Sequence, residues 1–438
     1  MSAPTSRSST AAGGELAPFV LDFDVKRSVS GIPAIDRDDV VYLANVTVGG
    51  QPFLVQLDTG SADFWIHKRE GMQVSKQTEQ RVKIEYGTGW VSGNIAFAPF
   101  TVGDFQVPSQ AFINVDASAD LDDLDGIWGL GFDRASNIHS ASSSSLTSHS
   151  PDSSTLTPLT NIFAQTPMTP NVLTLDLSRS ASGDASSSSS GTFTIGPYMP
   201  AARFEGVPHV PVAETSGGWE VALDGMRVNG QPFDLNTSMS ALATAVKKRW
   251  RWDKRQGQGG QNINVLLDSG TSFALVDDAA ADFIYGGMQG AKSCVIDGGK
   301  YWFVPCLATA NVSFGFGGRF FSVHPLDLTL VMDAEDLDGE PRTVCAGVFT
   351  GKSSAPDIRD EPLWVLGDAF MRNVLTAFHF GRETLEGGFD GAPTVQMASK
   401  TDQAAVATEF RRARWEALRG RPKMMDPVDV DCANVPHP

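Results

Sequence analysis

Two short stretches of the sequence, one in each half of the chain, repeat the same pattern. The stretch Val55–Ser61 reads VQLDTGS, and the stretch Val265–Thr271 reads VLLDSGT. Each combines an apolar run, typical of a β-strand, with an aspartate that enters a tight glycine turn. Each is followed further along the chain by two apolar residues and a glycine, at Ile127–Gly129 and at Val365–Gly367. The same parts therefore occur in the same order in both halves.

A single Asp-Ser/Thr-Gly-Ser/Thr motif would carry little information. Asp and Gly both favour turns, so the motif arises by accident in many chains. The simplest alternative is two independent β-turns, in which Asp58 and Asp268 only accept hydrogen bonds from nearby backbone N–H groups. Two copies on matched strands, together with the motifs described below, favour a shared chemical role for the two aspartates.

The length of the chain predicts more than one hydrophobic core. Its 438 residues exceed the usual size of a single domain, so we expect two lobes with appended segments. Short apolar runs alternate with Gly, Pro, Asn and Asp, as in Arg81–Phe97 and Val207–Val228, which is typical of a mainly β fold. The expected segments are a flexible leader or pro-segment remnant over 1–35, an N-terminal lobe over 36–205, a C-terminal lobe over 206–390 and a tail over 391–438 with a surface helix.

The net charge of −17 argues against some partners. So acidic a chain repels phosphate groups, and we expect it to bind neither nucleic acid nor an anionic membrane. No apolar run approaches the roughly 20 residues that span a bilayer, and the first ten residues lack the apolar core of a signal peptide. Residues 236–260 interleave Lys and Arg with Trp. We interpret this stretch as a solvated loop rather than a nucleic-acid site.

The four cysteines all lie in the second half of the chain, and none forms a C-x-x-C pair. We therefore expect disulfides and no metal site. Three N-glycosylation sequons, at Asn45, Asn236 and Asn311, fit a secretory route. The sequence thus predicts a secreted or vacuolar glycoprotein.

Five motifs follow one another along the chain. They are Asp58-Thr-Gly-Ser with Trp65 seven residues on, Tyr86-Gly-Thr-Gly, Asp125-Gly-Ile-Trp-Gly-Leu-Gly, Asp268-Ser-Gly-Thr-Ser and Trp364-Val-Leu-Gly-Asp368. In this order they resemble the pepsin family of bilobal aspartic proteases, over roughly residues 36–389. The resemblance implies two pseudo-symmetric, β-rich lobes with an active-site cleft between them, to which each lobe supplies one catalytic aspartate.

The resemblance also implies an aspartic endopeptidase that needs no cofactor. Two carboxyl groups about 3 Å apart share one proton, because both cannot ionise easily. A water molecule between Asp58 and Asp268 would attack the peptide carbonyl, with one carboxylate as base and the other as proton donor. The usual assignment in the family makes Asp268 the base and Asp58 the acid. We expect a monomer that cuts polypeptides at acidic pH and is inhibited by statine-type compounds.

Four residues of the two turns would support this pair. The hydroxyls of Ser61 and Thr271 are expected to hydrogen-bond the outer carboxylate oxygens, while Gly60 and Gly270 form the turns. As an alternative, each hydroxyl could simply satisfy its own turn.

The stretch Arg81–Phe97 is predicted to be a β-hairpin with its turn at Gly87-Thr88-Gly89. By resemblance this hairpin is the flap that closes over the substrate, with Tyr86, Gly87 and Thr88 facing the cleft. Trp65 is the expected hydrogen-bond partner of Tyr86, and Ile127 is grouped with the substrate-binding residues. The simpler alternative for Tyr86 is an ordinary strand aromatic.

By the same resemblance Cys306 pairs with Cys345. A second bridge, between Cys294 and Cys432, then follows if all four cysteines are oxidised. One departure from the family is His379, which stands where an acid is usual. Its charge would lower the pKa values of the aspartate pair, unless the imidazole is buried and neutral.

Two questions of activity and specificity stay open. The acidic run Asp116, Asp120, Asp122, Asp123 and Asp125 would favour basic substrates if it enters the cleft, and is a solvated loop otherwise. A catalytically inactive binding or inhibitor protein is the main alternative function. A glycoside hydrolase is a weaker one, because such enzymes hold their carboxylates about 5 Å or more apart.

Overall fold

The computed structural model describes most of the chain between residues 19 and 436. The description covers residues 19–22, 25–26, 41–145, 153–165, 170–179, 191–196, 201–213, 217–237, 263–296, 298–351, 363–383 and 389–436. Strands dominate, so the mainly β fold predicted from the sequence is confirmed. The basic stretch 236–260 falls almost entirely outside the described residues.

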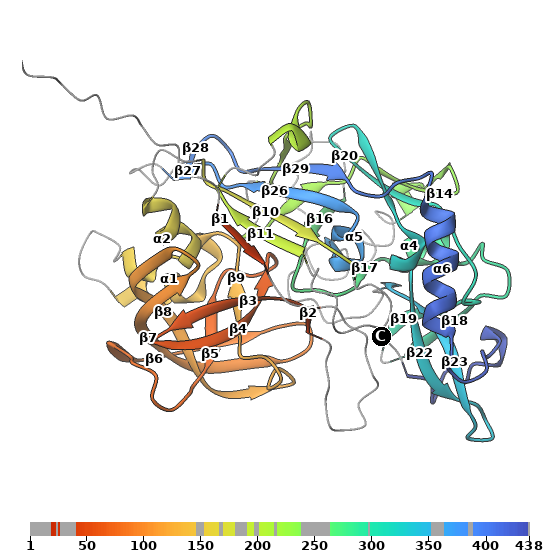
Figure 1. Ribbon diagram of the computed structural model, residues 1–438, viewed down its shortest axis with the longest axis horizontal. Coiled ribbons are helices and arrows are strands. Elements are labelled where there is room, and N and C mark those ends of the chain that lie inside the picture. The colour runs from red at the N-terminus through yellow and green to blue at the C-terminus, as the bar shows by residue number, and fades with distance from the viewer. Residues whose placement is uncertain are drawn as a thin grey trace, which may run out of the picture.

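The first half of the chain folds around one twisted sheet, drawn in red to orange in Figure 1. Most side chains of its inner strands are buried, whereas buried and exposed side chains alternate only near the end of the edge strand Lys76–Glu85. In spatial order the strands are β2 (Val25–Lys26), β3 (Val41–Val48), β4 (Gln51–Asp58), β9 (Gly126–Gly129), β5 (Phe64–His67), β8 (Phe105–Ala119), β7 (Trp90–Val102) and β6 (Lys76–Glu85), with α1 (Asn137–Ser145) and α2 (Pro158–Gln165) beside them.

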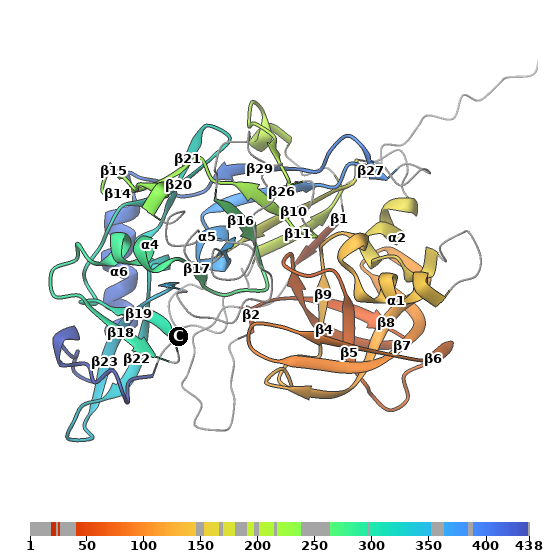
Figure 2. The same cartoon turned by 180° about the vertical axis from the view of Figure 1, so that it is seen from behind.

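The second half builds a larger unit from two sheets, seen in green to cyan in Figure 2. Its main sheet has the order β13 (Glu220–Ala222), β16 (Asn264–Leu267), β25 (Leu363–Leu366), β17 (Ala274–Val276), β24 (Phe349–Gly351), β19 (Gly299–Phe303), β23 (Pro341–Gly347) and β22 (Thr329–Glu335), with β18 (Lys292–Ile296) on β19. A smaller sheet has the order β15 (Gln231–Pro232), β14 (Gly225–Val228), β20 (Val312–Phe316) and β21 (Arg319–Val323). Helices α4 (Asp278–Tyr285) and α5 (Asp368–Met371) accompany these sheets.

The sequence repeat is also a repeat of strand pairing. In the first half β4 runs parallel to β9, and β9 pairs antiparallel with β5. In the second half β16 runs parallel to β25, and β25 pairs antiparallel with β17. The apolar pair and glycine that follow each copy thus form the strand next to it, which explains why both parts of the pattern recur together.

A further sheet combines strands from both halves and lies across them (Figure 1). Beneath it, Phe132 of the first half packs against Trp219 of the second, with ring centroids 4.5 Å apart, and Phe380 contacts both rings. The Trp219 indole N–H donates to the Leu130 carbonyl across the same junction, at 3.0 Å. The order of this sheet is β1 (Phe19–Asp22), β11 (Gly191–Ile195), β10 (Val172–Leu177), β26 (Val374–His379), β29 (Thr394–Ser399) and β12 (Val210–Pro211).

Two segments that the sequence suggested were appendages contribute to this fold. The stretch 1–35, interpreted as a flexible leader, supplies β1 to the shared sheet and β2 to the first. The stretch 391–438, interpreted as a tail, supplies β29 to the shared sheet, between β26 and β12. Neither contribution shows in the hydrophobic pattern, because strands of two to six residues are too short to carry one.

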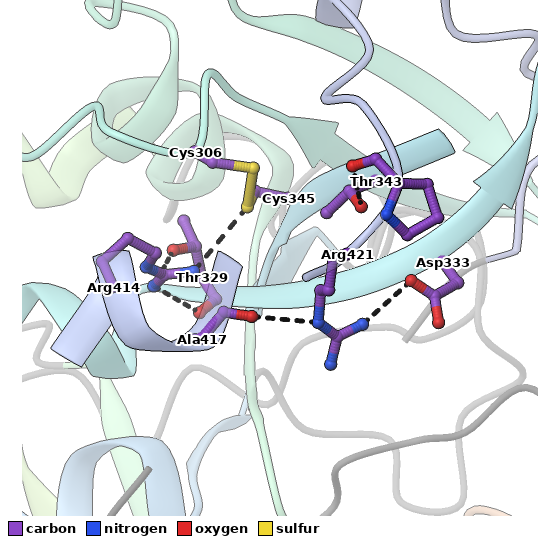
Figure 3. Close-up of a disulfide and its surroundings, with 9 residues drawn as sticks. Cys306, Thr329, Asp333, Thr343, Cys345, Arg414, Ala417 and Arg421 are labelled. Carbon is purple, nitrogen blue, oxygen red and sulfur yellow. Dashed lines mark hydrogen bonds and ion pairs between the residues drawn. A yellow bond between two sulfur atoms is a disulfide. The ribbon is translucent and has the colours of Figure 1, made fainter. Parts of the chain in front are cut away.

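The helix predicted in the tail forms as α6 (Val406–Leu418), at the outer end of the second half (Figures 1 and 2). It exposes Arg411 and Arg412 but buries Phe410 and Arg414. The Arg414 guanidinium donates to the carbonyl and the hydroxyl of Thr329, beside the disulfide of Cys345 (Figure 3). Burial lowers the pKa of Arg414 to about 10, which still leaves the buried guanidinium charged at neutral pH.

Both disulfides are present. Cys306 is joined to Cys345, the pairing implied by the family resemblance, and Cys294 is joined to Cys432. The second bridge closes a loop of 138 residues and attaches the end of the tail to β18. Beyond it, Lys292 Nζ donates to the Val430 carbonyl at 2.6 Å. The tail is thus held by covalent and polar contacts.

We predict that the Cys294→Ser/Cys432→Ser variant loses about 2–4 kcal/mol of unfolding free energy, because the bridge restricts a long loop of the unfolded chain. Hydrogen exchange should then accelerate in residues 419–436. The Cys306→Ser/Cys345→Ser variant is the control, since its bridge spans only 39 residues and joins no residue of the tail. Unchanged exchange in residues 419–436 of the first variant would contradict this account.

Candidate active site

The two repeated aspartates stand at the ends of equivalent strands. Asp58 is the last residue of β4, and Asp268 directly follows β16. We call residues 58–61 the first turn and residues 268–271 the second turn. The two turns meet where the halves of the molecule join.

Four hydrogen bonds between the two turns and their strands cross this junction. The Thr59 amide N–H donates to Ser269 Oγ at 3.1 Å, and the Ser269 amide N–H donates to Thr59 Oγ1 at 2.9 Å. Each hydroxyl then donates onward at 2.8 Å, from Thr59 to the Leu267 carbonyl and from Ser269 to the Leu57 carbonyl. Thr59 and Ser269 are fully buried, so this reciprocal set is shielded from competing water.

The two aspartate side chains lie against each other's turns. A Cβ added to Gly60 would stand 2.4 Å from Asp268 Oδ1, and one added to Gly270 would stand 2.4 Å from Asp58 Oδ1. No side chain fits at either position without moving a carboxyl group. The two glycines are therefore required by the close approach of the carboxyl groups.

Each carboxyl group is held by its own turn in the same way. The Gly60 amide N–H donates to Asp58 Oδ1 at 2.8 Å, and the Ser61 hydroxyl donates to Asp58 Oδ2 at 2.5 Å. In the second turn, the Gly270 amide N–H and the Thr271 hydroxyl donate to the two oxygens of Asp268, at 2.8 and 2.7 Å. Both hydroxyls therefore donate hydrogen bonds to the carboxyl groups. From the sequence alone, each hydroxyl could also have bonded only to the backbone of its own turn.

The environment of Asp58 favours its protonated form. Its side chain is 5% exposed. Burial, followed by the charge of Asp268, raises the pKa of Asp58 from 3.8 to about 8, although the Ser61 and Gly60 hydrogen bonds act in the opposite direction. Two adjacent carboxyl groups resist double ionisation, so the pair retains a proton above the usual pH range of a carboxyl group. The pair can then offer one acid and one base.

The predicted hairpin is formed by β6 and β7. Tyr86 directly follows β6, and its amide N–H donates to the Gly89 carbonyl at 2.7 Å, which closes the turn. Gly87 and Thr88 are exposed at the tip. The Tyr86 hydroxyl accepts a hydrogen bond from Trp65 Nε1 at 2.8 Å, as the resemblance implied.

The environment of Tyr86 places its hydroxyl close to the pair. Burial raises the pKa of Tyr86 well above 10, and the charges of Asp58 and Asp63 add to the effect. Ile127, grouped from sequence with the substrate-binding residues, is only 4% exposed. Ile127 belongs to the apolar cluster that also contains the buried side chains of the hairpin, and Tyr86 packs against this cluster. The contacts of Ile127 therefore support the hairpin.

One residue of this site escaped the sequence analysis. Asp63, two residues after Ser61, is 3% exposed and accepts hydrogen bonds from the Ser136 hydroxyl, the Asn137 side chain and the amide N–H groups of Asn137 and Ile138. It therefore joins the first turn to the start of α1. Its partners lie at the start of the Ser-rich stretch 136–154, whose composition is typical of a surface insertion. No local sequence signal connects the two.

The acidic run before Gly126 is largely engaged by other groups. Asp116 pairs with Arg81, and Asp125 pairs with Arg69 and accepts the Leu54 amide N–H. Asp122 accepts the Ser118 hydroxyl. Carboxylates held in this way do not provide a free anionic pocket, so the structure gives no support to a preference for basic substrates.

His379 takes part in a separate polar group. Its Nε2 lies 2.9 Å from Gln396 Oε1, and its ring centroid is 4.8 Å from that of His209. Burial, followed by the charge of His209, lowers the pKa of His379 to about 4. The imidazole is thus neutral above that pH. Within the described part of the chain no contact links His379 to either aspartate. This favours the alternative in which the imidazole is neutral and does not lower the pKa values of the aspartate pair.

The described residues contain no group of three or more His, Cys, Asp or Glu side chains that could hold a metal ion. Among the helices in the described ranges, none is long and apolar enough to cross a membrane.

Comparison with known proteins agrees with this geometry. The model of the eukaryotic aspartyl protease family matches residues 41–387. An aspartic-type endopeptidase, ctsD of Aspergillus fumigatus, is 24% identical over 389 residues, which cover 84% of this chain and 69% of that protein. Major aspartyl peptidase 1 of Cryptococcus neoformans is 27% identical over 364 residues, 78% of this chain and 67% of that protein. Cathepsin E-B of Xenopus laevis is 26% identical over 380 residues, 80% and 79% of the two chains.

The raised pKa of Asp58 predicts how stability depends on pH. Between its ordinary value of 3.8 and about 8, the folded protein binds a proton at Asp58 that the unfolded chain does not. Unfolding free energy therefore falls as pH rises through this window, by at most about 1.4 kcal/mol per pH unit. We expect Asp58→Asn to flatten this slope, as measured by urea unfolding at several pH values. The exposed Asp338→Asn is the control, and equal slopes in the wild type and Asp58→Asn would disprove the assignment.

Proposed function

The chain belongs to the eukaryotic aspartyl protease family, and we propose that it is an endopeptidase in which Asp58 and Asp268 activate a water molecule to hydrolyse peptide bonds. The observation that carries the proposal is the close approach of the two carboxyl groups, each lying against the glycine of the other's turn. A shared proton between them provides the acid and the base that the reaction needs.

In the proposed reaction the ionised Asp268 accepts a proton from the water as its oxygen attacks the peptide carbonyl carbon. The protonated Asp58 gives its proton to the carbonyl oxygen, which forms a neutral gem-diol without a covalent enzyme intermediate. Asp268 then passes the acquired proton to the amide nitrogen, a diol hydroxyl returns a proton to Asp58, and the C–N bond breaks. The raised pKa of Asp58 supports its role as the acid.

Substrate binding is assigned to the hairpin of β6 and β7. An extended polypeptide needs backbone hydrogen-bond partners along its length, and the turn exposes Gly87 and Thr88, whose backbone offers such groups. Tyr86, fixed by Trp65, is proposed to narrow the cleft and exclude water when the hairpin closes. Because the acidic run is engaged elsewhere, apolar substrate residues are the expected preference.

The proposed setting is an acidic, oxidising compartment, either outside the cell or in a vacuole. Two disulfides suit such a compartment. The sequon residues Asn45, Asn236 and Asn311 are all exposed, so N-glycans would fit on the folded surface. We further propose that the protein acts as a monomer and is inhibited by statine-type compounds, which imitate the gem-diol.

The alternatives lack comparable support. A relative that only binds would be expected to lose an aspartate, a supporting hydroxyl or Tyr86, and this chain keeps all of them. A glycoside hydrolase would hold its carboxyl groups about 5 Å or more apart, whereas here each carboxyl group lies against the opposite turn.

We predict that Asp58→Asn and Asp268→Asn each lower kcat for cleavage of a denatured protein at acidic pH by at least about 1000-fold, because either change removes one half of the pair. Circular dichroism should show that both variants remain folded. Asp338→Asn, which alters an exposed acid, should retain wild-type activity. An aspartate variant with more than a tenth of wild-type turnover would refute the proposed catalytic pair.

A further inference from the structure

The two copies of the repeat differ in one respect that bears on the site. Two residues before Asp58 stands Gln56, whereas the matching position before Asp268 is Leu266. Both side chains are buried, at 7% and 8% exposure. A buried amide costs free energy unless it is hydrogen-bonded, while a buried leucine does not. The glutamine therefore needs a partner, and the structure provides one.

Gln56 reaches across the junction to the opposite turn. Its Nε2 donates to the Gly270 carbonyl oxygen at 3.0 Å. Residues 56 and 58 lie on the same face of β4, because side chains alternate along a strand. Gln56 is thus placed beside the first aspartate while it holds the turn of the second. Leu266 has no donor with which to make the reciprocal contact, so this bond breaks the symmetry of the site.

The Gly270 carbonyl lies between the two groups of the second turn that donate hydrogen bonds to Asp268. The carbonyl and the following amide belong to one rigid peptide plane, and glycine lets that plane rotate more freely than other residues do. On one side of this plane, the Gly270 N–H donates to Asp268 Oδ1. On the other side, Thr271 donates its hydroxyl to Asp268 Oδ2. Fixing the plane therefore restrains Thr271 directly, and it also limits the rotation about Gly270 that would move the Gly270 N–H away from the carboxyl group.

We infer that Gln56 is a positioning residue, which holds the second turn so that the Thr271 hydroxyl stays on Asp268. The inference rests on the proposed function of the pair. Loss of the Gln56 bond loosens the Thr271 hydroxyl, and a carboxylate that loses a donor is stabilised less in its ionised form. The ionised member of the pair then forms only at a higher pH. Gln56 acts on Asp268 in this way without touching the substrate.

The test compares two buried glutamines. Gln56→Met keeps the length of the side chain and removes the donor. Gln110→Met makes the same change at a residue that is 1% exposed and whose Nε2 donates to the Leu156 carbonyl at 2.9 Å, within the first half of the molecule. Gln56→Leu, which copies the second repeat, is a further variant in case methionine packs poorly.

We expect Gln56→Met to lower kcat about five- to tenfold, the worth of about one buried hydrogen bond, with KM changed less than twofold. The acidic limb of the kcat/KM pH profile should move to higher pH by about half a unit, with the alkaline limb unmoved. Gln110→Met should lower the melting temperature but leave kcat and both limbs unchanged. Activity of Gln56→Met equal to that of Gln110→Met would overturn the inference.

A second readout separates this inference from the proposed function. Carboxyl ¹³C titration by NMR follows the ionisation of Asp58 and Asp268 in all variants, whether or not the protein cleaves polypeptides. An inactive wild type would refute the proposed function alone. A titration of the pair that shifts in Gln56→Met and Gln56→Leu but not in Gln110→Met would support the positioning role, and identical titrations in all of them would refute it.

Discussion

The four hydrogen bonds that join each turn to the opposite turn and its strand determine where the two carboxyl groups lie. Each turn by itself presents an aspartate at the end of a strand, and such turns are common. The reciprocal bonds of Thr59 and Ser269 bring the two turns together in a buried junction, where Asp58 and Asp268 cannot both ionise easily. The shared sheet and the contact of Phe132 with Trp219 hold the halves in place around this junction. The chemistry therefore depends on a contact that neither half can make alone.

The sequence predicted those features that repeat or that lie close together along the chain. The duplicated motif indicated a shared chemical role for Asp58 and Asp268, and the order of motifs indicated the family and the mainly β fold. It could not show that Asp63 binds the start of α1, because the partners are more than 70 positions away in a stretch of low complexity. Gln56 escaped for a similar reason, since its partner lies 214 positions away. Contacts between distant segments leave no local pattern.

The end of the chain also makes contacts that the sequence pattern does not reveal. Helical spacing predicted α6, yet periodicity alone could not show that Arg414 turns inward to Thr329 while its neighbours remain exposed. Nor could it show that β29 enters the shared sheet. A segment that seemed an appendage is thus attached at three places, by a strand, a helix and the Cys294–Cys432 bridge. Through β29, which pairs with β26, the tail forms part of the sheet that joins the two halves.

We propose that the pair of Asp58 and Asp268 carries a single proton, which is bound to Asp58. Neutron diffraction from a deuterium-exchanged crystal grown at about pH 5 would observe this proton directly. The account predicts one deuterium on the pair, bound to the Asp58 carboxyl group, with Asp268 ionised and accepting from Thr271. Two deuteriums, none, or one bound to Asp268 would contradict it.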